Sequence, residues 1–366
     1  MTLPNRSPFG LKGLTVLYAV MAMSASLQAG VAWGKAMKQA PAWYESDEAA
    51  KLADTILAYQ HPTGGWPKNT DMSVPPPADY AAKLAASVKG EYAPTIDNGA
   101  TTSQLDFLAK LISLRQEKRW VDSFNRGVDY LLAAQYENGG WPQFYPLRKG
   151  YYTHITFNDN AMVRVMRVLG KVAKGQDSFS FTDPERRAKA AKAVDKGIAC
   201  ILACQIVVEG KKTVWCAQHD EVTFAPAKAR AYELPSFSGA ESIDIVQLLM
   251  EIEKPGKAVI ESVQGAVAWF DAHKISGIRL EKKPAPELKG GHDLVVIQDP
   301  AAKDLFWARF YELSSGRPIF VGRDGQIHYA VSEIEAERRN GYAWYTTEAR
   351  SLLDKQYPKW KKRLGL

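Results

Sequence analysis

A sequence of the type Gln-x-x-x-Gly-x-Trp recurs along this 366-residue chain, and its spacing constrains the fold more than any other feature. The copies are residues 60–66, residues 135–141 and a weaker third, 205–210, which is followed by Trp215. The three tryptophans lie 75 and 74 residues apart. Each copy follows one amphipathic run and precedes another, which is typical of a repeated unit of helix, loop and helix. The pattern predicts a mainly α fold, an (α/α)3 toroid in which three helical hairpins close into a ring.

Apolar periodicity predicts where the helices of these hairpins lie. Ser46 before Glu48, and Asp183 before Pro184, are typical helix starts. The outer helices are expected at 43–59, 118–135 and 183–205, the inner ones from 98–102 to 114, at 159–174 and at 239–252, and a further helix at 258–272. The toroid would then occupy about residues 43–272, and the last 30 residues are expected to form a closing helix.

Beyond residue 276 the pattern changes to short β-like runs separated by glycine-containing turns. These runs are residues 294–298, 306–311, 318–322 and 326–330. They predict a small β-containing cap on the helical ring, over about residues 276–335.

The N-terminal segment, residues 1–32, has the features of a secretory signal peptide. Arg6 and Lys12 precede an apolar run at 14–26, and small residues follow. This run is too short to span a bilayer. A buried N-terminal helix is the alternative. No other segment is long and apolar enough for a membrane helix, so we expect a secreted or periplasmic protein that binds no membrane.

Formal charge favours an acidic partner only weakly. The net charge of +7 falls to +5 without residues 1–32, because that segment holds two basic residues and no acidic one. A positive surface suits an acidic ligand, although a charge of this size can also serve solubility alone.

Three cysteines leave two interpretations open. In an oxidising compartment Cys204 and Cys216 could form a disulfide and leave Cys200 buried, or all three could be packed thiols.

The N-termini of the inner helices should meet at one end of the ring, and two of them carry acidic residues. Asp97 with Asn98, and Asp159 with Asn160, would lie at equivalent places. Either aspartate alone suits the role of a helix N-cap. Together, two carboxylates and neighbouring amide oxygens suit Ca²⁺ better than zinc.

A long polar connection before the third inner helix would bring cations to these acids. Residues 215–236 are too many for a minimal connection and include Lys228, Arg230 and Tyr232. The cations could neutralise the aspartates or take part in catalysis. Aromatic residues on these loops are first of all packing residues, but with lysine and arginine they would also suit a chain of sugars that bear carboxylates.

Six stretches together resemble the signatures of the family 10 polysaccharide lyases, the all-helical pectate lyases. They are Gly-Gly-Trp-Pro-Lys (64–68), Thr-Ile-Asp-Asn-Gly-Ala-Thr-Thr (95–102), Gly-Gly-Trp-Pro-Gln-Phe-Tyr-Pro (139–146), His-Ile-Thr-Phe-Asn-Asp-Asn-Ala-Met (154–162), Trp-Cys-Ala-Gln-His-Asp (215–220) and Ala-Arg-Ala-Tyr-Glu-Leu-Pro (229–235). The resemblance spans about residues 45–345. It departs at Phe237, where the family usually has leucine.

This resemblance implies a secreted pectate lyase that cleaves polygalacturonate by Ca²⁺-dependent β-elimination. Asp97 and Asp159 resemble the family's metal-binding aspartates, and Arg230 resembles its catalytic base. Arg309 and Arg323 resemble arginines that hold uronate carboxylates.

Position and charge add further candidates to those that the resemblance implies. Asn98 is expected to be a metal ligand, and Lys68, Lys228 and Tyr232 are expected to bind substrate. The catalytic domain would be residues 33–366, a monomer whose partners are pectin oligosaccharides and not nucleic acid.

The expected chemistry starts at C5 of galacturonate, whose hydrogen lies α to a carboxylate. A calcium ion between the two aspartates and this carboxylate would stabilise the carbanion, while Arg230 takes the proton and the C4 oxygen leaves. Free arginine has a pKa above about 12, so this role calls for an alkaline optimum and a lowered Arg230 pKa beside Ca²⁺. The alternatives are an inverting glycoside hydrolase with Asp97 and Asp159 as acid and base, and a non-catalytic pectin-binding protein.

Overall fold

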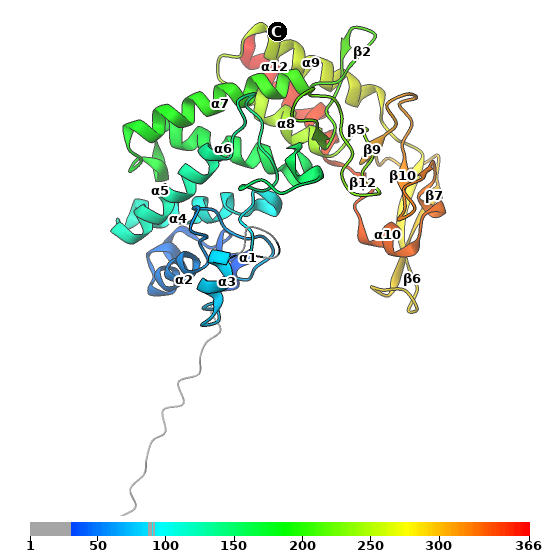
Figure 1. The fold of residues 1–366 in the computed structure, drawn as a ribbon. Coiled ribbons are helices and arrows are strands. Elements are labelled where there is room, and N and C mark those ends of the chain that lie inside the picture. The colour runs from blue at the N-terminus through cyan, green and yellow to red at the C-terminus, as the bar shows by residue number, and fades with distance from the viewer. Residues whose placement is uncertain (1–30, 87–89, 91) are drawn as a thin grey trace, which may run out of the picture.

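The computed structural model of the chain describes residues 31–86, 90 and 92–366, and it is 47% helical (Figure 1). The predicted signal peptide, residues 1–32, lies almost entirely outside the described residues. None of the described helices combines the length and the apolar character needed to cross a membrane.

The predicted helices are all present, close to their expected bounds. An outer row consists of α2 (Asp47–Ala58), α5 (Lys118–Ala133), α7 (Pro184–Cys204) and α9 (Lys257–Ala272). An inner row consists of α4 (Thr102–Leu114), α6 (Ala161–Lys174) and α8 (Glu241–Met250). Shorter helices are α1 (Trp33–Ala36), α3 (Tyr80–Ala86), α10 (Ala336–Gly341), α11 (Glu348–Ser351) and α12 (Tyr357–Leu364).

Two of the helix starts use the predicted caps. The Ser46 hydroxyl accepts a hydrogen bond from the Ala49 amide at 3.2 Å, and the Asp183 carboxylate accepts one from the Arg186 amide at 2.9 Å. Each side chain satisfies an amide that the helix itself leaves without a partner. These local signals explain why the bounds of α2 and α7 could be predicted.

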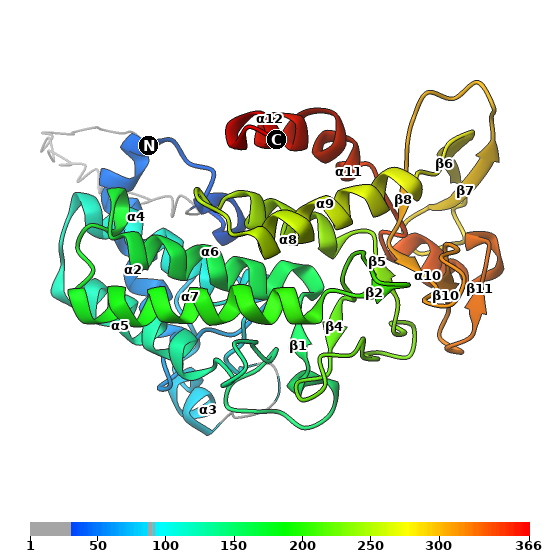
Figure 2. The same ribbon diagram turned by 90° about the horizontal axis from the view of Figure 1, so that it is seen from above.

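The closed ring predicted from the repeat is wrong. Neighbouring helices pack in the order α2, α5, α7, α9 in the outer row and α4, α6, α8 in the inner row. Figure 1 shows these rows as an open arc, with α2 at one end and α9 at the other. Figure 2 shows α12 beside the α9 end, far from α2. The repeat spacing specifies which helices form a hairpin, but not the rotation between successive hairpins that decides closure.

The glutamines of the repeat join each loop to the next outer helix. The Gln135 amide donates to the carbonyl of Gly139 in its own loop (3.0 Å) and to that of Ala193 in α7 (2.8 Å). Gln60 and Gln205 form the same pair of bonds, to the carbonyls of Gly64 and Ser123 and to those of Thr213 and Ser262. Because each loop is bonded to the next hairpin, the repeat determines the order of packing.

Close approach between a loop and the next helix requires glycine at two positions. Gly139 has a φ of 91°, and an added Cβ would lie 2.1 Å from the Lys196 carbonyl oxygen in α7. Gly64 has a φ of 105° and would place a Cβ 2.1 Å from the Arg126 carbonyl oxygen. Any larger residue at these positions would push the hairpins apart.

The three repeat tryptophans are packing residues. Trp66, Trp141 and Trp215 are fully buried. Each indole N–H donates to a carbonyl of the preceding outer helix, from Ile56, Leu131 and Ile201 respectively. They therefore do not line a sugar-binding surface.

The predicted β-containing cap is present only as short ladders. β6 (Ile278–Pro284) and β7 (His292–Gln298) form a seven-residue antiparallel hairpin. The other described strands are dipeptides. Three of their ladders include residues of the cap: β5 (Phe237–Ser238) with β9 (Phe310–Tyr311), β8 (Trp307–Ala308) with β12 (Tyr345–Thr346), and β10 (Phe320–Val321) with β11 (Ile327–His328). Two ladders lie on the hairpin loops instead: β1 (Ile155–Thr156) with β4 (Gln218–His219), and β2 (Val207–Val208) with β3 (Lys211–Lys212). The fold class is therefore an open helical arc with few strands.

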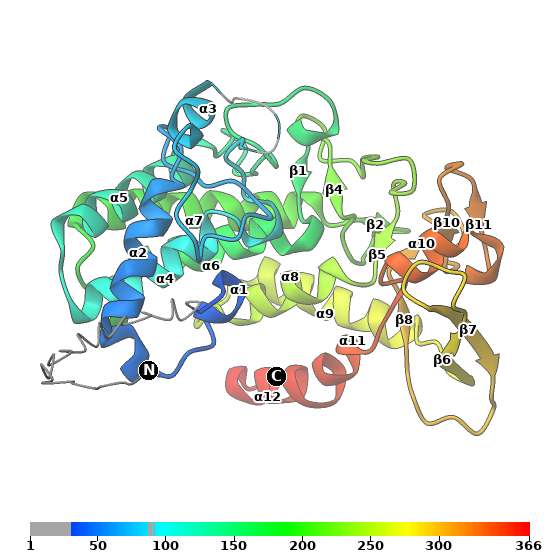
Figure 3. The same ribbon diagram turned by 90° about the horizontal axis from the view of Figure 1, so that it is seen from below.

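One of these ladders attaches the cap to the helical arc. β9 pairs with β5, and the Gly239 amide donates to the Arg309 carbonyl at 2.9 Å. Arg309 is thereby placed beside the start of α8. Figure 3 shows the α3, β1 and β4 segments projecting from one side of the helices, with α12 on the opposite side.

The three cysteines form no disulfide. Cys200, Cys204 and Cys216 are all free and buried. The interpretation as packed thiols is the one that the structure matches.

Candidate functional site

Two short 3₁₀ turns carry the predicted acidic residues, and these turns contact each other. They are Asp97–Gly99, before α4, and Asn158–Asn160, before α6. Asn98 and Asp159 have the same backbone conformation, φ 51° and ψ 29°. Asn98, and not Asp97, is therefore the structural equivalent of Asp159, and the expected correspondence of the two aspartates is wrong by one residue.

Neither aspartate is a helix cap. The N-cap residues of α4 and α6 are Thr101 and Asn160, and neither makes a side-chain capping bond. One oxygen of Asp97 instead accepts the Asn98 amide at 3.0 Å. The alternative role of Asp97 and Asp159 as N-caps is therefore wrong, and both carboxylates face other groups.

Asp97 is a buried carboxylate with one cationic partner. Its exposed fraction is 3%, and it forms an ion pair with Lys68. Its own amide donates to the Thr95 hydroxyl at 3.1 Å, which fixes the start of the turn. Lys68 and Asn98 also line a cavity of about 380 Å³ that opens beside this turn.

Asp159 lies between an arginine and other acids. The Arg309 guanidinium is 3.6 Å from its carboxylate and also forms an ion pair with Glu241. Burial raises the pKa of the Asp159 carboxyl, and the negative charges of Glu241 and Asp97 add to this rise, while Arg309 opposes it. Burial is thus the main reason that the Asp159 carboxyl is harder to ionise, and the neighbouring acids are a smaller one.

Oxygen ligands on the two turns fit a hard cation. The side-chain oxygens of Asp97, Asn98 and Asp159 are all of the type that Ca²⁺ prefers. Asn98 donates its amide N–H to Asn69 at 3.0 Å, so its amide oxygen remains an acceptor. A cation between the turns would favour the ionised form of Asp159, against the burial and the smaller repulsion that raise its pKa.

Arg230 is held by a carboxylate that was not predicted. Its Nε donates to Glu233 at 2.7 Å, and its Nη2 is paired with the second Glu233 oxygen. That second oxygen also accepts the Tyr342 hydroxyl at 3.0 Å. The hydrogen bonds that Arg230 donates to Glu233 raise the pKa of Arg230 above its ordinary value. The lowering of the Arg230 pKa was expected beside Ca²⁺ and stays a prediction, while the protein contacts alone act in the opposite direction.

The other predicted substrate-binding residues lie around Tyr232. Tyr232 is only 5% exposed, and the guanidinium groups of Arg230 and Arg323 lie 4.9 and 5.5 Å from its ring centre. Arg323 is exposed and pairs with Glu337 at 3.0 Å. Lys228 is exposed and has no ion pair or hydrogen bond with any described residue. Tyr232 is thus placed to support the arginines more than to stack on a sugar.

Sequence reasoning missed two acids of the site. Glu233 follows Arg230 by three residues, a spacing that could have indicated an ion pair within the long connection. Glu241 is the first residue of α8 and is the acid of the third hairpin. In the sequence, only its position at the start of an inner helix indicated a role in the site. Both acids bind arginines, so they decide which guanidinium N–H groups remain for a ligand.

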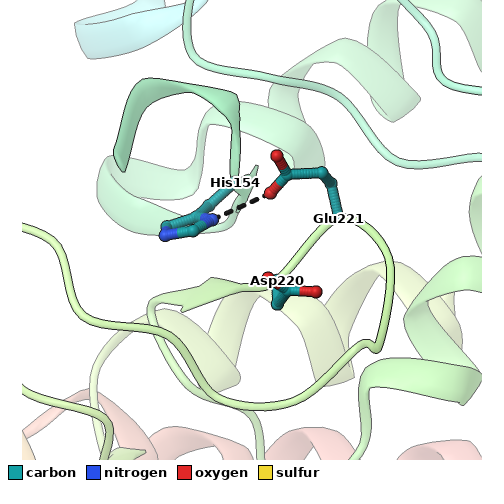
Figure 4. A group of neighbouring side chains, drawn as sticks. All are labelled: His154, Asp220 and Glu221. Carbon is teal, nitrogen blue, oxygen red and sulfur yellow. Dashed lines mark hydrogen bonds and ion pairs between the residues drawn. The ribbon is translucent and has the colours of Figure 1, made fainter. Parts of the chain in front are cut away.

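A separate group of metal-ligand types lies on the β1 and β4 loops (Figure 4). His154, Asp220 and Glu221 form the one group of three such side chains, among the described residues, whose ligand atoms all lie within 4.8 Å of one another. His154 Nδ1 contacts Glu221 at 2.9 Å. One Asp220 oxygen accepts the amides of Val222 and Thr223, so it shapes its own turn. These contacts explain the group as a link between the two loops.

A larger cavity than the one beside Asp97 is at the other end of the helices. It has a volume of about 520 Å³ and is lined mainly by apolar groups between α6, α7 and α8. Its residues include Lys174, the last residue of α6, and Glu253, which follows α8. The acidic turns lie at the N-termini of these helices, so this cavity is not part of the candidate site.

Comparison with known proteins gives one family. A sequence model of the family described as pectic acid lyase matches residues 60–353. A solved family 10 polysaccharide lyase from Cellvibrio cellulosa, an aspartate-to-alanine mutant in complex with trigalacturonic acid, is 31% identical, with 91% of this chain and 96% of that chain covered and a TM-score of 0.73. A second structure of a family 10 polysaccharide lyase from the same organism is 32% identical, with coverages of 90% and 95% and a TM-score of 0.73. No curated protein sequence matches the chain.

Proposed function

Because the chain belongs to the pectic acid lyase family, as a family 10 polysaccharide lyase, we propose that it is a pectate lyase that cleaves polygalacturonate, de-esterified pectin, by β-elimination. The observation that carries this proposal is a group of charged residues around Asp159. The charges of Asp97, Arg309 and Arg230 all act on its carboxyl. An acidic polymer needs cations to hold its carboxylates, and elimination needs a base at C5. The residues of this cluster are suited to both tasks.

We further propose that Asp97, Asp159 and Asn98 hold Ca²⁺. Bound there, Ca²⁺ would supply positive charge to the substrate carboxylate and so make the C5 proton more acidic. Lys68 then has a defined task, because its ion pair orients the buried Asp97 carboxylate. The oxygen ligands and the raised Asp159 pKa support this assignment.

The arginines of the site divide into holders of substrate and a base. We assign Arg309 and Arg323 to the binding of uronate carboxylates. The guanidinium carbon of Arg309 lies 4.6 Å from the ring centre of Tyr342, and Arg323 is exposed on the cap. Lys228 and Tyr232 complete this binding surface, Tyr232 by supporting the guanidinium groups. Arg230 is assigned to the C5 proton, which it can accept only as a neutral guanidine. Since Glu233 favours the charged form, activity should rise toward alkaline pH.

Export to the periplasm or the medium is part of the proposal. Residues 1–32 have the basic start and the apolar core of a signal peptide, and residues 33–366 would be the catalytic domain. A polymeric substrate that cannot enter the cell is consistent with this location.

The experiment that tests the proposal is an assay of polygalacturonate cleavage with and without EDTA. Elimination leaves an unsaturated uronate that absorbs in the ultraviolet, whereas hydrolysis by a glycoside hydrolase leaves none. We expect the absorbance to increase with time. EDTA should stop this increase, and added Ca²⁺ should restore it. Reducing sugar without absorbance would indicate the hydrolase instead, and binding without any product would indicate a pectin-binding protein.

The Arg230→Lys variant tests the base. We expect kcat to fall about 10²- to 10⁴-fold, as is typical for loss of a general base, while KM for polygalacturonate changes little. Turnover equal to that of the wild type would contradict the assignment of Arg230.

A further inference from the structure

Three aromatic side chains form a wall beside the first acidic turn. The rings of Phe144 and Tyr152 lie 5.3 Å apart at 89°, and those of Tyr151 and Tyr152 lie 4.1 Å apart. Phe144 is 3% exposed and pairs through its backbone with Thr95, two residues before Asp97. The wall is therefore fixed to the backbone of the candidate site.

Arg148 lies over this wall. Its guanidinium carbon is 4.2 Å from the ring centre of Tyr152 and 5.3 Å from that of Phe144. The Lys68 ammonium, which pairs with Asp97, is 5.7 Å from the same Phe144 ring. Arg148 and Lys68 thus share one aromatic neighbour, and Arg148 extends the positive surface beyond the acidic turns.

The same wall reaches the other side of the site. Burial raises the pKa of Tyr151, and the charges of Arg230 and Glu233 act on its hydroxyl. Through Tyr152, over whose ring Arg148 lies, the wall runs from Arg148 to Tyr151. A polymer that reaches Arg230 along this wall would pass Arg148.

Arg148 differs from the other arginines of the site because it has no counter-ion. Arg230, Arg309 and Arg323 each contact a carboxylate, as does Lys68. Arg148 has no ion pair and no hydrogen bond with any residue that the structure describes. Its N–H donors are left for water or for an anion, while the rings limit the orientations of its planar group.

We infer that Arg148 binds a uronate carboxylate of the polymer at a subsite beyond the acidic turns and makes binding there sensitive to methyl esterification. A guanidinium held over rings can still present two parallel N–H groups to a carboxylate. A methyl ester removes the negative charge and one strong acceptor, so it loses most of this interaction. The inference rests on the proposed function and adds a substrate-binding residue to it.

The test measures equilibrium binding of oligogalacturonates and of their methyl esters to the full-length wild type, to Arg148→Gln and to Lys149→Gln. Lys149 is the matched control, because it is exposed on the same loop, carries the same charge and contacts no described ring. Calcium-free buffer suppresses turnover, so binding is read without cleavage. Circular dichroism and thermal unfolding confirm that each variant is folded.

We expect Arg148→Gln to raise Kd for the unesterified oligomer about tenfold, because a charge-assisted hydrogen bond is lost at a partly exposed site. Kd for the methyl ester should stay within about twofold of the wild-type value. Lys149→Gln should change either Kd by less than about twofold. Arg148→Lys, which keeps the charge but not the fork, should lie in between.

Three results would overturn the inference. An unchanged Kd in Arg148→Gln would mean that Arg148 does not contact the polymer. Equal losses in Arg148→Gln and Lys149→Gln would mean that only overall charge matters, and equal losses for acid and ester would indicate packing alone. A wild type that binds oligogalacturonate but releases no unsaturated product would refute the lyase chemistry, and not this subsite.

Discussion

Replacing Glu233 with glutamine tests whether Arg230 is the titrating base. One Glu233 oxygen accepts the Arg230 Nε–H at 2.7 Å, and the other accepts the Tyr342 hydroxyl at 3.0 Å. Glutamine preserves the shape of this side chain and removes its charge, so the guanidinium loses its nearest counter-ion. Because Glu233 favours the charged guanidinium, the substitution should lower the pKa of Arg230.

The size of this change follows from the burial of the two groups. Two unit charges about 4 Å apart attract each other by about 4 kcal/mol at an effective dielectric constant of 20 and by about 1 kcal/mol in water. Glu233 is 5% exposed, but the Arg230 side chain is 41% exposed and is therefore partly screened. A value of about 1.4 kcal/mol corresponds to about one pH unit. A base works in its neutral form, so the rise of kcat with pH should move about one unit toward lower pH.

The assay follows the unsaturated product over a range of alkaline pH for the wild type and for Glu233→Gln. The absolute kcat should fall as well, since Glu233 also orients the guanidinium, so the position of the profile is the decisive quantity. Glu251→Gln is the matched control, because Glu251 pairs with Arg167 at 2.8 Å at the far end of α8 and should leave the profile unchanged. A lower kcat with an unshifted profile in Glu233→Gln would refute the reasoning, since Arg230 would then not be the group that titrates.

Two further substitutions test the proposed metal ligands and the repeat. Asp159→Asn removes a charged oxygen ligand and should raise the calcium concentration for half-maximal activity about tenfold or more, as measured by calcium titration. Asp106→Asn, whose aspartate pairs with Lys171 on the helices, should not do so, and an unchanged requirement in Asp159→Asn would exclude that residue as a ligand. Gly139→Ala should lower the free energy of unfolding in urea by about 3 kcal/mol, because its Cβ would lie 2.1 Å from the Lys196 carbonyl oxygen at a φ of 91°. Gly341→Ala, where an added Cβ meets nothing within 4 Å, should change it by less than about 0.5 kcal/mol, and equal effects of the two would mean that the close approach at Gly139 is not required.

Those parts of the fold that depend on local chemistry could be predicted. Ser46 and Asp183 are caps in the structure, and the helices that follow them begin at the expected places. The repeated glutamine was visible in the sequence, and its two bonds per copy explain why it recurs. The signal came from residues whose partners lie within the same loop or in the next helix.

Closure of the ring and the match between the two turns depend on geometry that no residue pattern specifies. An open arc and a closed ring bury the same faces within each hairpin, so hydrophobic periodicity is equal for both. The offset between Asp97 and Asp159 appears only in the backbone, where Asn98 takes the conformation of Asp159. The contact between Glu233 and Arg230 is local, and their spacing of three residues is compatible with an ion pair, but a loop without periodicity does not specify that the two side chains turn toward each other.

The site arises because the third hairpin does not repeat the first two. The Trp66 amide donates to the Thr101 hydroxyl, and the Trp215 amide donates to the Ser242 hydroxyl, so Thr101 and Ser242 occupy equivalent places. Asp97 lies four residues before Thr101, and Ser238 lies four residues before Ser242. Ser238 therefore corresponds to Asp97. Where the first two turns present acids to each other, the third presents serine.

The acid of the third hairpin comes three residues later, as Glu241, and it binds Arg309 from the cap instead of a partner on another turn. If the third turn also carried an acid in place of Ser238, three carboxylates would lie on the three turns, with no guanidinium group on any of these turns. The departure from symmetry leaves two acidic turns for a cation and turns the third toward the arginines. With the proposed cation bound between the acidic turns, an acidic sugar held between these two halves would meet positive charge from both, which is the arrangement that the proposed elimination next to a carboxylate calls for.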